Sequence, residues 1–434
     1  MVTLAITGGQ VLRPDGTVER ADVLLERESG TIRNIGPGLG EDATETLDAT
    51  DALVTPGFVN GHCHVSMTLL RGYADDKPLD TWLAEDIWPA EVELEPADIA
   101  AGAALGILEM IKGGTTTFVD MYFAVPEIAS VVERAGVRAV LGHGVISVGK
   151  DESDWRADAE TGLSVARDLD GAADGRISTA FMPHSLTTVE RELYETYVPE
   201  AREAGVPIHL HANETRAEVD PLVDDHGRRP LEYAHELGLL EPEDFLAHGV
   251  HLDETEIDLL AETGASVIHC PASNMKLASG MAPVTRLREA GVTVGLGTDG
   301  AASNNDLSML DEIRDAAMLG KLETGDAAAI PAATAVEMAT AGSADAVGLE
   351  TGRLTVGAPA DLAVVDLSGP HLAPRHDLVS HLAYAATAAD VRHTVCDGEI
   401  LMRDREVQTL DERDVIEHAT ERARSLLDRV ENAD

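Results

Sequence analysis

The middle of the chain alternates between short apolar runs and longer stretches that are rich in Ala and Glu. The short runs are typical of strands and the longer stretches of helices, and repeated strand–helix units predict an α/β fold with a parallel sheet. Eight runs occur, the number that a closed (β/α)8 barrel of the TIM type needs. An open, doubly wound sheet is the alternative, but no glycine-rich phosphate-binding fingerprint follows an early strand. The predicted strands cover residues 54–64, 115–122, 138–145, 177–185, 207–214, 245–252, 265–273 and 292–300.

The two ends of the chain share a different pattern, in which short β-type runs are broken by Gly, Asp and Pro. We therefore expect residues 1–55 and 352–408 to form one small β-sandwich domain beside the barrel of residues 56–351. The last segment, 409–434, has helical spacing and is predicted to be a peripheral C-terminal helix.

Side chains that can ligate a metal ion stand where the predicted strands end. His62 and His64 end the first run, His211 ends the fifth, and Asp299 ends the eighth. Side chains at positions i and i+2 of a strand share one face, so the first two imidazoles point the same way. The carboxyl ends of barrel strands form the active-site face. Three histidines and one aspartate suit Zn²⁺, Fe²⁺ or Mn²⁺, so the sequence predicts a divalent metal ion, with zinc as the first expectation.

Three further polar residues end predicted strands. His184 ends the fourth run, Glu214 the fifth and His248 the sixth. A bound metal would lower the pKa of a water from ~15.7 towards ~7. Glu214, three residues past His211, could carry a proton between that water and a substrate, and His248 could orient or polarise the nucleophile.

The amino-acid composition limits which binding partners and which cellular compartment we expect for the protein. The 434 residues carry 78 acidic and 32 basic side chains, for a net charge of −46, and only five of the basic residues are lysines. Such a charge repels nucleic acid and anionic membranes. Its spread along the whole chain indicates adaptation to a high-salt cytoplasm, where ions screen the repulsion. No long apolar stretch predicts a membrane span, no signal peptide is evident, and three distant cysteines suggest no disulfide framework, so we expect a cytoplasmic protein.

Several motifs resemble one enzyme family over nearly the full length. "PGFVNGHCHVSMTLLRG", "HLHANET", "HCPASNMKLASGMAPV" and "GLGTDGAASNN" are similar to the amidohydrolase superfamily, and within it to the 5-methylthioadenosine/S-adenosylhomocysteine deaminases. The resemblance implies one metal ion, hydrolytic attack at C6 of an adenine ring, and release of ammonia with an inosine-type product. Two-metal relatives use a bridging lysine from the fourth strand, and no lysine occurs between Lys150 and Lys276.

The resemblance also implies roles for particular residues. Glu91, in "IWPAE", matches the residue that binds the ribose hydroxyls, and His184 matches a substrate-contacting histidine. Glu214 corresponds to the proton shuttle at the purine ring. Asp299 corresponds to a ligand that also accepts the water's proton.

Two positions depart from the family pattern. Many members carry an arginine at the position of His143 and a second arginine in the following loop, where Arg156 stands here. A guanidinium grips a carboxylate in bidentate fashion, which a histidine cannot do. We treat both residues as candidate substrate contacts and expect the 5′ tail pocket to have changed. Adenosine, 2′-deoxyadenosine and 5′-methylthioadenosine are then as good candidates as S-adenosylhomocysteine.

Two other functions stay open at this point. A related enzyme could apply the same chemistry to a free base or an s-triazine ring, in which case Glu91 has no ribose to hold. A non-catalytic metal-binding scaffold would not need Glu214. As partners we expect a small-molecule nucleoside substrate and further copies of the chain, since barrel enzymes of this kind often pair through their outer helices.

Overall fold

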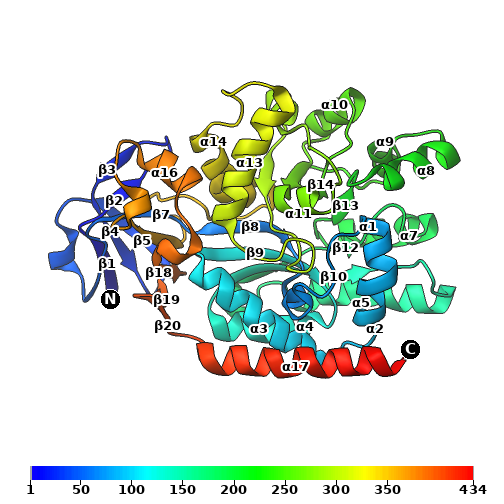
Figure 1. Ribbon diagram of the computed structural model, residues 1–434, viewed down its shortest axis with the longest axis horizontal. Helices are drawn as coiled ribbons and strands as arrows, with labels where there is room; N and C mark the ends of the chain where they lie inside the picture. The colour runs from blue at the N-terminus through cyan, green and yellow to red at the C-terminus, as the bar shows by residue number, and fades with distance from the viewer. Residues whose placement is uncertain (1, 434) are drawn as a thin grey trace.

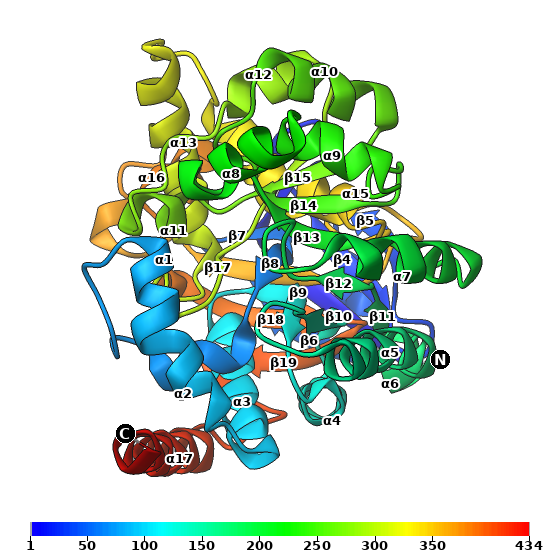
Figure 2. The same cartoon turned by 90° about the vertical axis from the view of Figure 1, so that its right-hand side faces the viewer.

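The structure, a computed structural model that describes residues 2–433, is built around a barrel of parallel strands. Figure 2 shows these strands in the middle, with helices around them. The predicted barrel fold is confirmed, and each strand occupies part of a predicted run. The strands are β8 (Phe58–Cys63), β9 (Thr115–Tyr122), β10 (Arg138–Val145), β11 (Ile177–Thr179) with β12 (Met182–Pro183), β13 (His209–Ala212), β14 (Phe245–His248), β15 (Ser266–His269) and β16 (Val294–Leu296).

Two joints complete the ring of strands. Single parallel bridges, Phe181 to Ile208 and Ser185 to His211, connect the fourth strand to β13. At the other joint the Asp299 amide donates to the carbonyl of His62 at 3.0 Å. The barrel strands are almost wholly buried, as parallel strands covered on both faces must be.

The first predicted run, 54–64, spans a break that the apolar pattern did not predict. Its first residues belong to β7 (Ala52–Pro56), a strand of the small domain, and barrel strand β8 begins at Phe58. The break falls at Gly57, where a Cβ would lie 2.2 Å from the Thr116 hydroxyl. Only glycine lets the chain pass this close to β9.

Amphipathic helices cover the strands, and α4 (Val125–Ala135) shows why they form. Ile128, Val131, Val132 and Ala135 are buried at i, i+3, i+4 and i+7, and the helix ends at Gly136, whose φ is +81°. The other helices after the barrel strands are α3 (Pro96–Lys112), α5 (Glu152–Asp168), α6 (Ala172–Gly175), α7 (Arg191–Glu203), α8 (Arg216–His226), α9 (Pro230–Glu236), α10 (Glu254–Thr263), α11 (Pro271–Lys276), α12 (Val284–Glu289), α13 (Met309–Thr324), α14 (Ala332–Glu337) and α15 (Ser343–Ala346).

Short helical segments lie between β8 and α3 and in the last third of the chain. Several are single turns, including two π-helical segments, η3 and η4. They are η2 (Val65–Leu70), α1 (Leu79–Trp82), η3 (Leu83–Ile87), α2 (Trp88–Val92), η4 (Met338–Gly342), η5 (Pro370–Leu372), α16 (Leu378–Tyr384) and η6 (Ala388–Asp390).

Strands from both ends of the chain form the small domain, at the left of Figure 1. A four-stranded sheet has the order β5-β4-β1-β6 and a seven-stranded sheet the order β20-β19-β18-β17-β7-β2-β3. Side chains from both sheets, such as Ile6 and Val364, share one apolar core. The strands and one short helix are β1 (Thr3–Thr7), β2 (Gln10–Leu12), β3 (Val18–Arg20), β4 (Asp22–Glu26), β5 (Thr31–Gly36), η1 (Leu39–Asp42), β6 (Glu45–Asp48), β17 (Leu362–Asp366), β18 (Val391–Cys396), β19 (Glu399–Arg403) and β20 (Glu406–Val407).

The C-terminal helix α17 (Glu412–Ala433) packs along α3, at the bottom of Figure 1. Asp98, at the start of α3, is fully buried and forms ion pairs with both Arg422 and Arg429 of α17. The Arg422 Nε to Asp98 Oδ1 distance is 2.7 Å. This charged cluster fixes the helix against the barrel.

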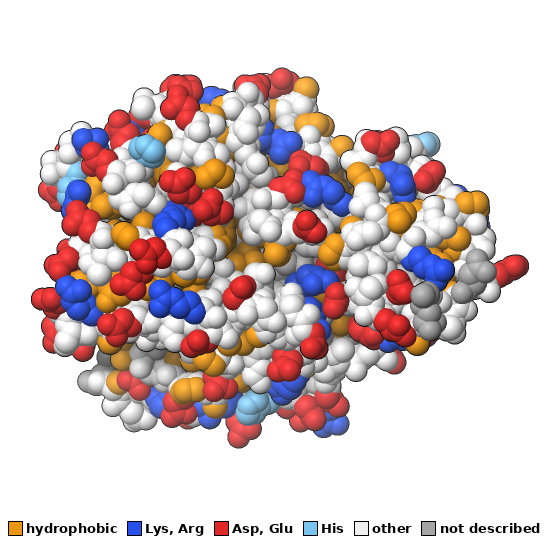
Figure 3. All heavy atoms as spheres, turned by 180° about the vertical axis from the view of Figure 1, so that it is seen from behind, with side chains coloured by type: hydrophobic (Ala, Val, Ile, Leu, Met, Phe, Trp, Pro, Cys, Tyr) orange, Lys and Arg blue, Asp and Glu red, His pale blue; other side chains and the backbone are white. Residues whose placement is uncertain are grey.

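Acidic side chains are spread over the face that Figure 3 shows, which lies behind that of Figure 1. Basic side chains on this face are fewer and lie among the acidic ones. None of the helices in residues 2–433 is both long and apolar enough to cross a membrane.

Candidate metal centre and active site

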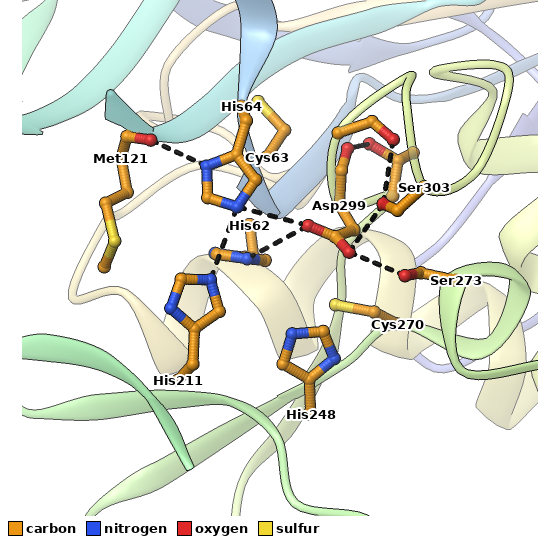
Figure 4. A network of polar contacts seen from close by, with 12 residues as sticks. His62, Cys63, His64, Met121, His211, His248, Cys270, Ser273, Asp299 and Ser303 are labelled. Carbon is orange, nitrogen blue, oxygen red and sulfur yellow. Dashed lines mark hydrogen bonds and ion pairs between the residues drawn. The ribbon is translucent and has the colours of Figure 1, made fainter. Parts of the chain in front are cut away.

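Four side chains converge at the carboxyl end of the barrel strands (Figure 4). His62 and His64 come from β8 and the turn after it, whereas His211 comes from β13 and Asp299 from the loop after β16. Asp299 Oδ1 lies 3.5 Å from His62 Nε2 and 3.2 Å from His64 Nε2. The Nε2 atoms of His64 and His211 are 3.3 Å apart. Three distant parts of the sequence thus bring three nitrogen atoms and one oxygen to a single point.

Backbone carbonyls determine which nitrogen of two of these imidazoles carries the proton. His64 Nδ1 lies 2.7 Å from the carbonyl oxygen of Met121, and His211 Nδ1 lies 2.7 Å from that of His184. A carbonyl can only accept, so Nδ1 is the donor and Nε2 of the neutral ring keeps its lone pair. Both Nε2 atoms point to the shared centre, where a metal ligand must offer a lone pair.

For His62, the position of the ring proton is fixed by another buried histidine, His209, rather than by a backbone carbonyl. His209 Nδ1 donates to the carbonyl of Phe245 at 2.8 Å, so its Nε2 accepts the Nδ1 proton of His62, also at 2.8 Å. Burial lowers the pKa of His62 to about 4, which keeps its ring neutral. The sequence analysis missed His209, although it stands two residues before His211, the spacing that singled out His62 and His64.

Two serines hold the carboxylate of Asp299. Its Oδ2 accepts from the hydroxyls of Ser273 at 2.6 Å and Ser303 at 2.7 Å, which leaves Oδ1 to face the imidazoles. Burial raises the pKa of Asp299, but the imidazoles of His62 and His64 beside its Oδ1 outweigh burial and leave the pKa well below its usual range. Asp299 also has a φ of +62°, a conformation that non-glycine residues rarely adopt and that clusters at functional sites.

This set of atoms fits a divalent metal ion. His62 Nε2 is buried and has no hydrogen-bond partner among the residues that the structure describes. Ligand nitrogens of His62, His64 and His211 lie within 4.8 Å of one another. Atoms that bind a tetrahedral Zn²⁺ at roughly 2.0–2.1 Å are about 3.4 Å apart, close to the 3.2–3.5 Å found between Asp299 Oδ1 and the two imidazoles of β8. Nitrogen and carboxylate ligands suit zinc, iron and manganese alike.

Glu214 and His248 lie beside this centre. Glu214 Oε2 is 3.7 Å from His248 Nε2, and Glu214 Oε1 is buried without a hydrogen-bond partner among the described residues. Burial raises the pKa of Glu214, which favours a carboxyl group that can hold a proton. His248 Nδ1 donates to the Asn274 side-chain oxygen at 3.0 Å, so Nε2 faces the site with its lone pair.

A cavity of about 480 Å³ opens from the centre, a size that suits a nucleoside. His184 and Glu91 line it together with Glu214, His248 and Asp299. The structure therefore brings eight of the ten candidate residues to the centre or its cavity. The lining residues are His64, Met67, Leu79, Asp80, Trp82, Leu83, Ala84, Trp88, Glu91, Met121, Tyr122, Phe123, Gly144, Ile146, Val148, His184, Ser185, Thr187, Thr188, His211, Glu214, Thr215, Ala217, Glu218, His248, Asp299 and Ser303.

Burial sets the protonation of several lining groups. It raises the pKa of Glu91, on α2, to about 7 and lowers the pKa of His184 to about 3. His184 Nδ1 lies 2.8 Å from the Thr188 hydroxyl. The sequence analysis missed Glu218, whose Oε2 accepts from the Glu214 amide at 2.8 Å. Burial raises the pKa of Glu218 to about 8, so this group is mainly neutral at pH 7.

His143 and Arg156, the other two candidates, do not line the cavity. His143 Nε2 lies 2.8 Å from Asp158 Oδ1. Arg156 forms ion pairs with Glu152 at 3.0 Å and Glu192 at 2.6 Å on the surface. Each of these two side chains is therefore paired with a carboxylate outside the cavity lining.

Comparisons with known proteins agree with this geometry. Residues 53–401 match the Amidohydrolase family. A protein of Halobacterium salinarum named 5-methylthioadenosine/S-adenosylhomocysteine deaminase is 65% identical and is aligned over 98% of both chains. A 5'-deoxyadenosine deaminase of Methanosarcina acetivorans is 43% identical over 99% of both chains. The crystal structure of an adenosine deaminase from Xanthomonas campestris with bound zinc superposes with a TM-score of 0.91, with 38% identity and 99% coverage of both chains.

The chain belongs to the amidohydrolase family. The resemblance that the sequence motifs carried is confirmed, as is the prediction of a hydrolase that acts on C–N bonds. A metal-dependent site follows from the family and from the four converging side chains.

Proposed function

We propose that the chain is a hydrolytic deaminase of adenosine-type nucleosides that uses one divalent ion, with zinc as the first choice. The observation that best supports this proposal is the position of the Glu214 carboxyl group. It lies in the wall of a nucleoside-sized cavity, beside His248 and next to the four ligand side chains. A pure binding site needs ligands but no proton carrier. The names of the relatives, which specify 5-methylthioadenosine, S-adenosylhomocysteine and 5'-deoxyadenosine, support this class of substrate.

His62, His64, His211 and Asp299 would hold the metal ion. When bound, the ion would activate water at neutral pH. Glu91, which lines the cavity, would bind the ribose hydroxyls, and a free base would leave Glu91 without a partner.

Glu214 would move the protons of the reaction. Water adds to C6 of the adenine ring, the C6–N bond breaks, and ammonia leaves with an inosine-type product. The attacking water gives up both of its protons: Glu214 would carry one to the ring nitrogen beside C6, and Asp299 would accept the other, which passes to the amino group that leaves as ammonia. His248, whose Nδ1 proton is held by Asn274, presents Nε2 as an acceptor that orients the attacking oxygen. His184 would contact the purine as a neutral ring.

Ammonia release tests this function at high salt with added Zn²⁺ or Mn²⁺. Substrates are adenosine, deoxyadenosine, 5′-methylthioadenosine, S-adenosylhomocysteine, guanine, cytosine and an s-triazine. We expect activity on the nucleosides only, a loss of roughly 10²–10⁴-fold in Glu214→Gln, and unchanged metal content in that variant. Activity on a free base or triazine alone would overturn the substrate class. Full activity of Glu214→Gln would overturn the role of Glu214. A cytoplasmic location, a homo-oligomeric state and adaptation to high salt stay predictions.

A further inference from the structure

We propose that the outer cavity selects adenosine nucleosides with an uncharged, apolar 5′ substituent and discriminates against the charged amino-acid tail of S-adenosylhomocysteine. This inference rests on the proposed function, because it concerns the 5′ end of the same nucleoside. The observations that carry it are the side chains around the cavity, the anchoring of one wall, and the positions of nearby cations.

Apolar side chains supply much of the cavity lining away from the ligand histidines. They come from four stretches of chain: the helical segment after residue 78, the end of β9, the loop after β10, and Met67 of η2. Such a wall binds a methyl, methylthio or alkyl group by contact and by removal of water. Thioether sulfur atoms also pack well against aromatic rings. These side chains are Met67, Leu79, Trp82, Leu83, Trp88, Met121, Phe123, Ile146 and Val148.

Apart from histidines, the ionisable Asp, Glu, Lys and Arg side chains in the lining are all acidic. Among the lining residues that the structure describes there is no lysine or arginine, and the acidic ones are Asp80, Glu91, Glu214, Glu218 and Asp299. The amino group of a homocysteine tail could meet the exposed carboxylate of Asp80. Its carboxylate would meet no cation, and like charges brought together oppose binding. A carboxylate that loses water without gaining a partner weakens binding.

A single, partly buried carboxylate fixes one apolar wall. Asp158 of α5 accepts from His143 Nε2 at 2.8 Å, from the Ile146 amide at 2.9 Å and from Lys150 Nζ at 2.8 Å. The amide of Val148 also donates to the carbonyl of Thr188 at 3.1 Å. These bonds hold Ile146 and Val148 in the lining. They also pair the ammonium group of Lys150 with Asp158, and Lys150 is not part of the lining.

The nearest other cations lie outside the lining. Arg156 is engaged by Glu152 and Glu192. Arg216 stands between the lining residues Thr215 and Ala217, but its own side chain is exposed and is not part of the lining. If the side chain of Arg216 bound the tail carboxylate of S-adenosylhomocysteine at the cavity entrance, the proposal would be wrong.

Steady-state kinetics with matched 5′ substituents test the proposal at one fixed, high salt concentration. We expect 5′-methylthioadenosine and the longer, uncharged 5′-butylthioadenosine to be deaminated with similar kcat/KM. The value for S-adenosylhomocysteine should be lower by about tenfold or more. If S-adenosylhomocysteine equals or exceeds 5′-methylthioadenosine, the proposal is wrong. If the butylthio compound is as poor as S-adenosylhomocysteine, length and not charge decides, which also overturns it.

Substitutions at the wall separate charge from shape. Val148→Arg adds a cation to the lining and should raise the ratio of kcat/KM for S-adenosylhomocysteine over 5′-methylthioadenosine by about tenfold. The matched variant Val148→Met, of similar length but uncharged, should not raise it. Arg216→Gln should leave the ratio unchanged, and a fall in the ratio would show that Arg216 binds the tail. If none of these nucleosides releases ammonia, the proposed function itself fails.

Discussion

The hydrogen bond between His62 and His209 gives a direct test of how the metal site is organised. His209 accepts the Nδ1 proton of His62 at 2.8 Å, and both side chains are fully buried. His209→Phe keeps a ring of similar size and removes the acceptor. His62 must then keep an unpaired, buried N–H or move the proton to Nε2, the atom that would bind the metal.

The expected loss follows from the cost of an unpaired buried donor. That cost is about 1–3 kcal/mol. Because each 1.4 kcal/mol is a factor of ten, the metal dissociation constant should rise roughly 10–100-fold, as for other residues that orient metal-binding histidines. His209→Gln is the matched control, since an amide can accept from His62 and donate to the carbonyl of Phe245. It should retain most of the affinity.

Competition with a chromophoric chelator measures Zn²⁺ affinity for the three proteins. Thermal melts of the metal-free proteins show whether the Phe variant merely folds less well. If His209→Phe binds Zn²⁺ within about twofold of the unaltered protein, the positioning of His62 by His209 is wrong. Equal losses in the Phe and Gln variants would point to packing and would also contradict it.

Three further predictions concern stability. Asp98→Asn should lower the free energy of unfolding by about 2 kcal/mol in urea titrations, because two partly exposed arginines of α17 lose their buried counter-ion; no change would contradict the docking role. Burial raises the pKa of Glu218 from 4.5 to about 8, so its contribution to stability is full below 4.5 and is lost as the pH rises towards 8. Melting temperatures of Glu218→Gln should therefore fall less over this range than those of the unaltered protein, and parallel curves would refute the shift. Dilution of salt should lower the melting temperature, because weaker screening leaves the net charge of −46 to repel itself; a salt-independent melt would refute this.

Much of the barrel could be predicted from the sequence because its strands are buried on both faces and so form continuous apolar runs. The carboxyl ends of these runs also contain the candidate ligands His62, His64, His211 and Asp299, which the fold brings together. The break between β7 and β8 could not be predicted, because Gly57 is needed only where the chain passes the Thr116 side chain of another strand.

The residues that position the site were harder to predict because their partners come from other elements. His209 gains its role through Phe245 of the next strand, and Glu218 through the backbone of Glu214. The position of His143 depends on Asp158, which lies on the following helix. Spacing along the chain can locate a ligand at a strand end, but it does not give the hydrogen bonds that orient it.

One measurement tests the central claim most directly. The Zn²⁺-loaded protein is incubated with 5′-methylthioadenosine in water enriched in heavy oxygen, and ammonia and the purine product are quantified together. The account predicts equal amounts of ammonia and inosine-type product, with one heavy oxygen at C6, and almost none of either in Glu214→Gln. An unlabelled product, cleavage of the sugar–base bond instead, or the same rate in Glu214→Gln would contradict it.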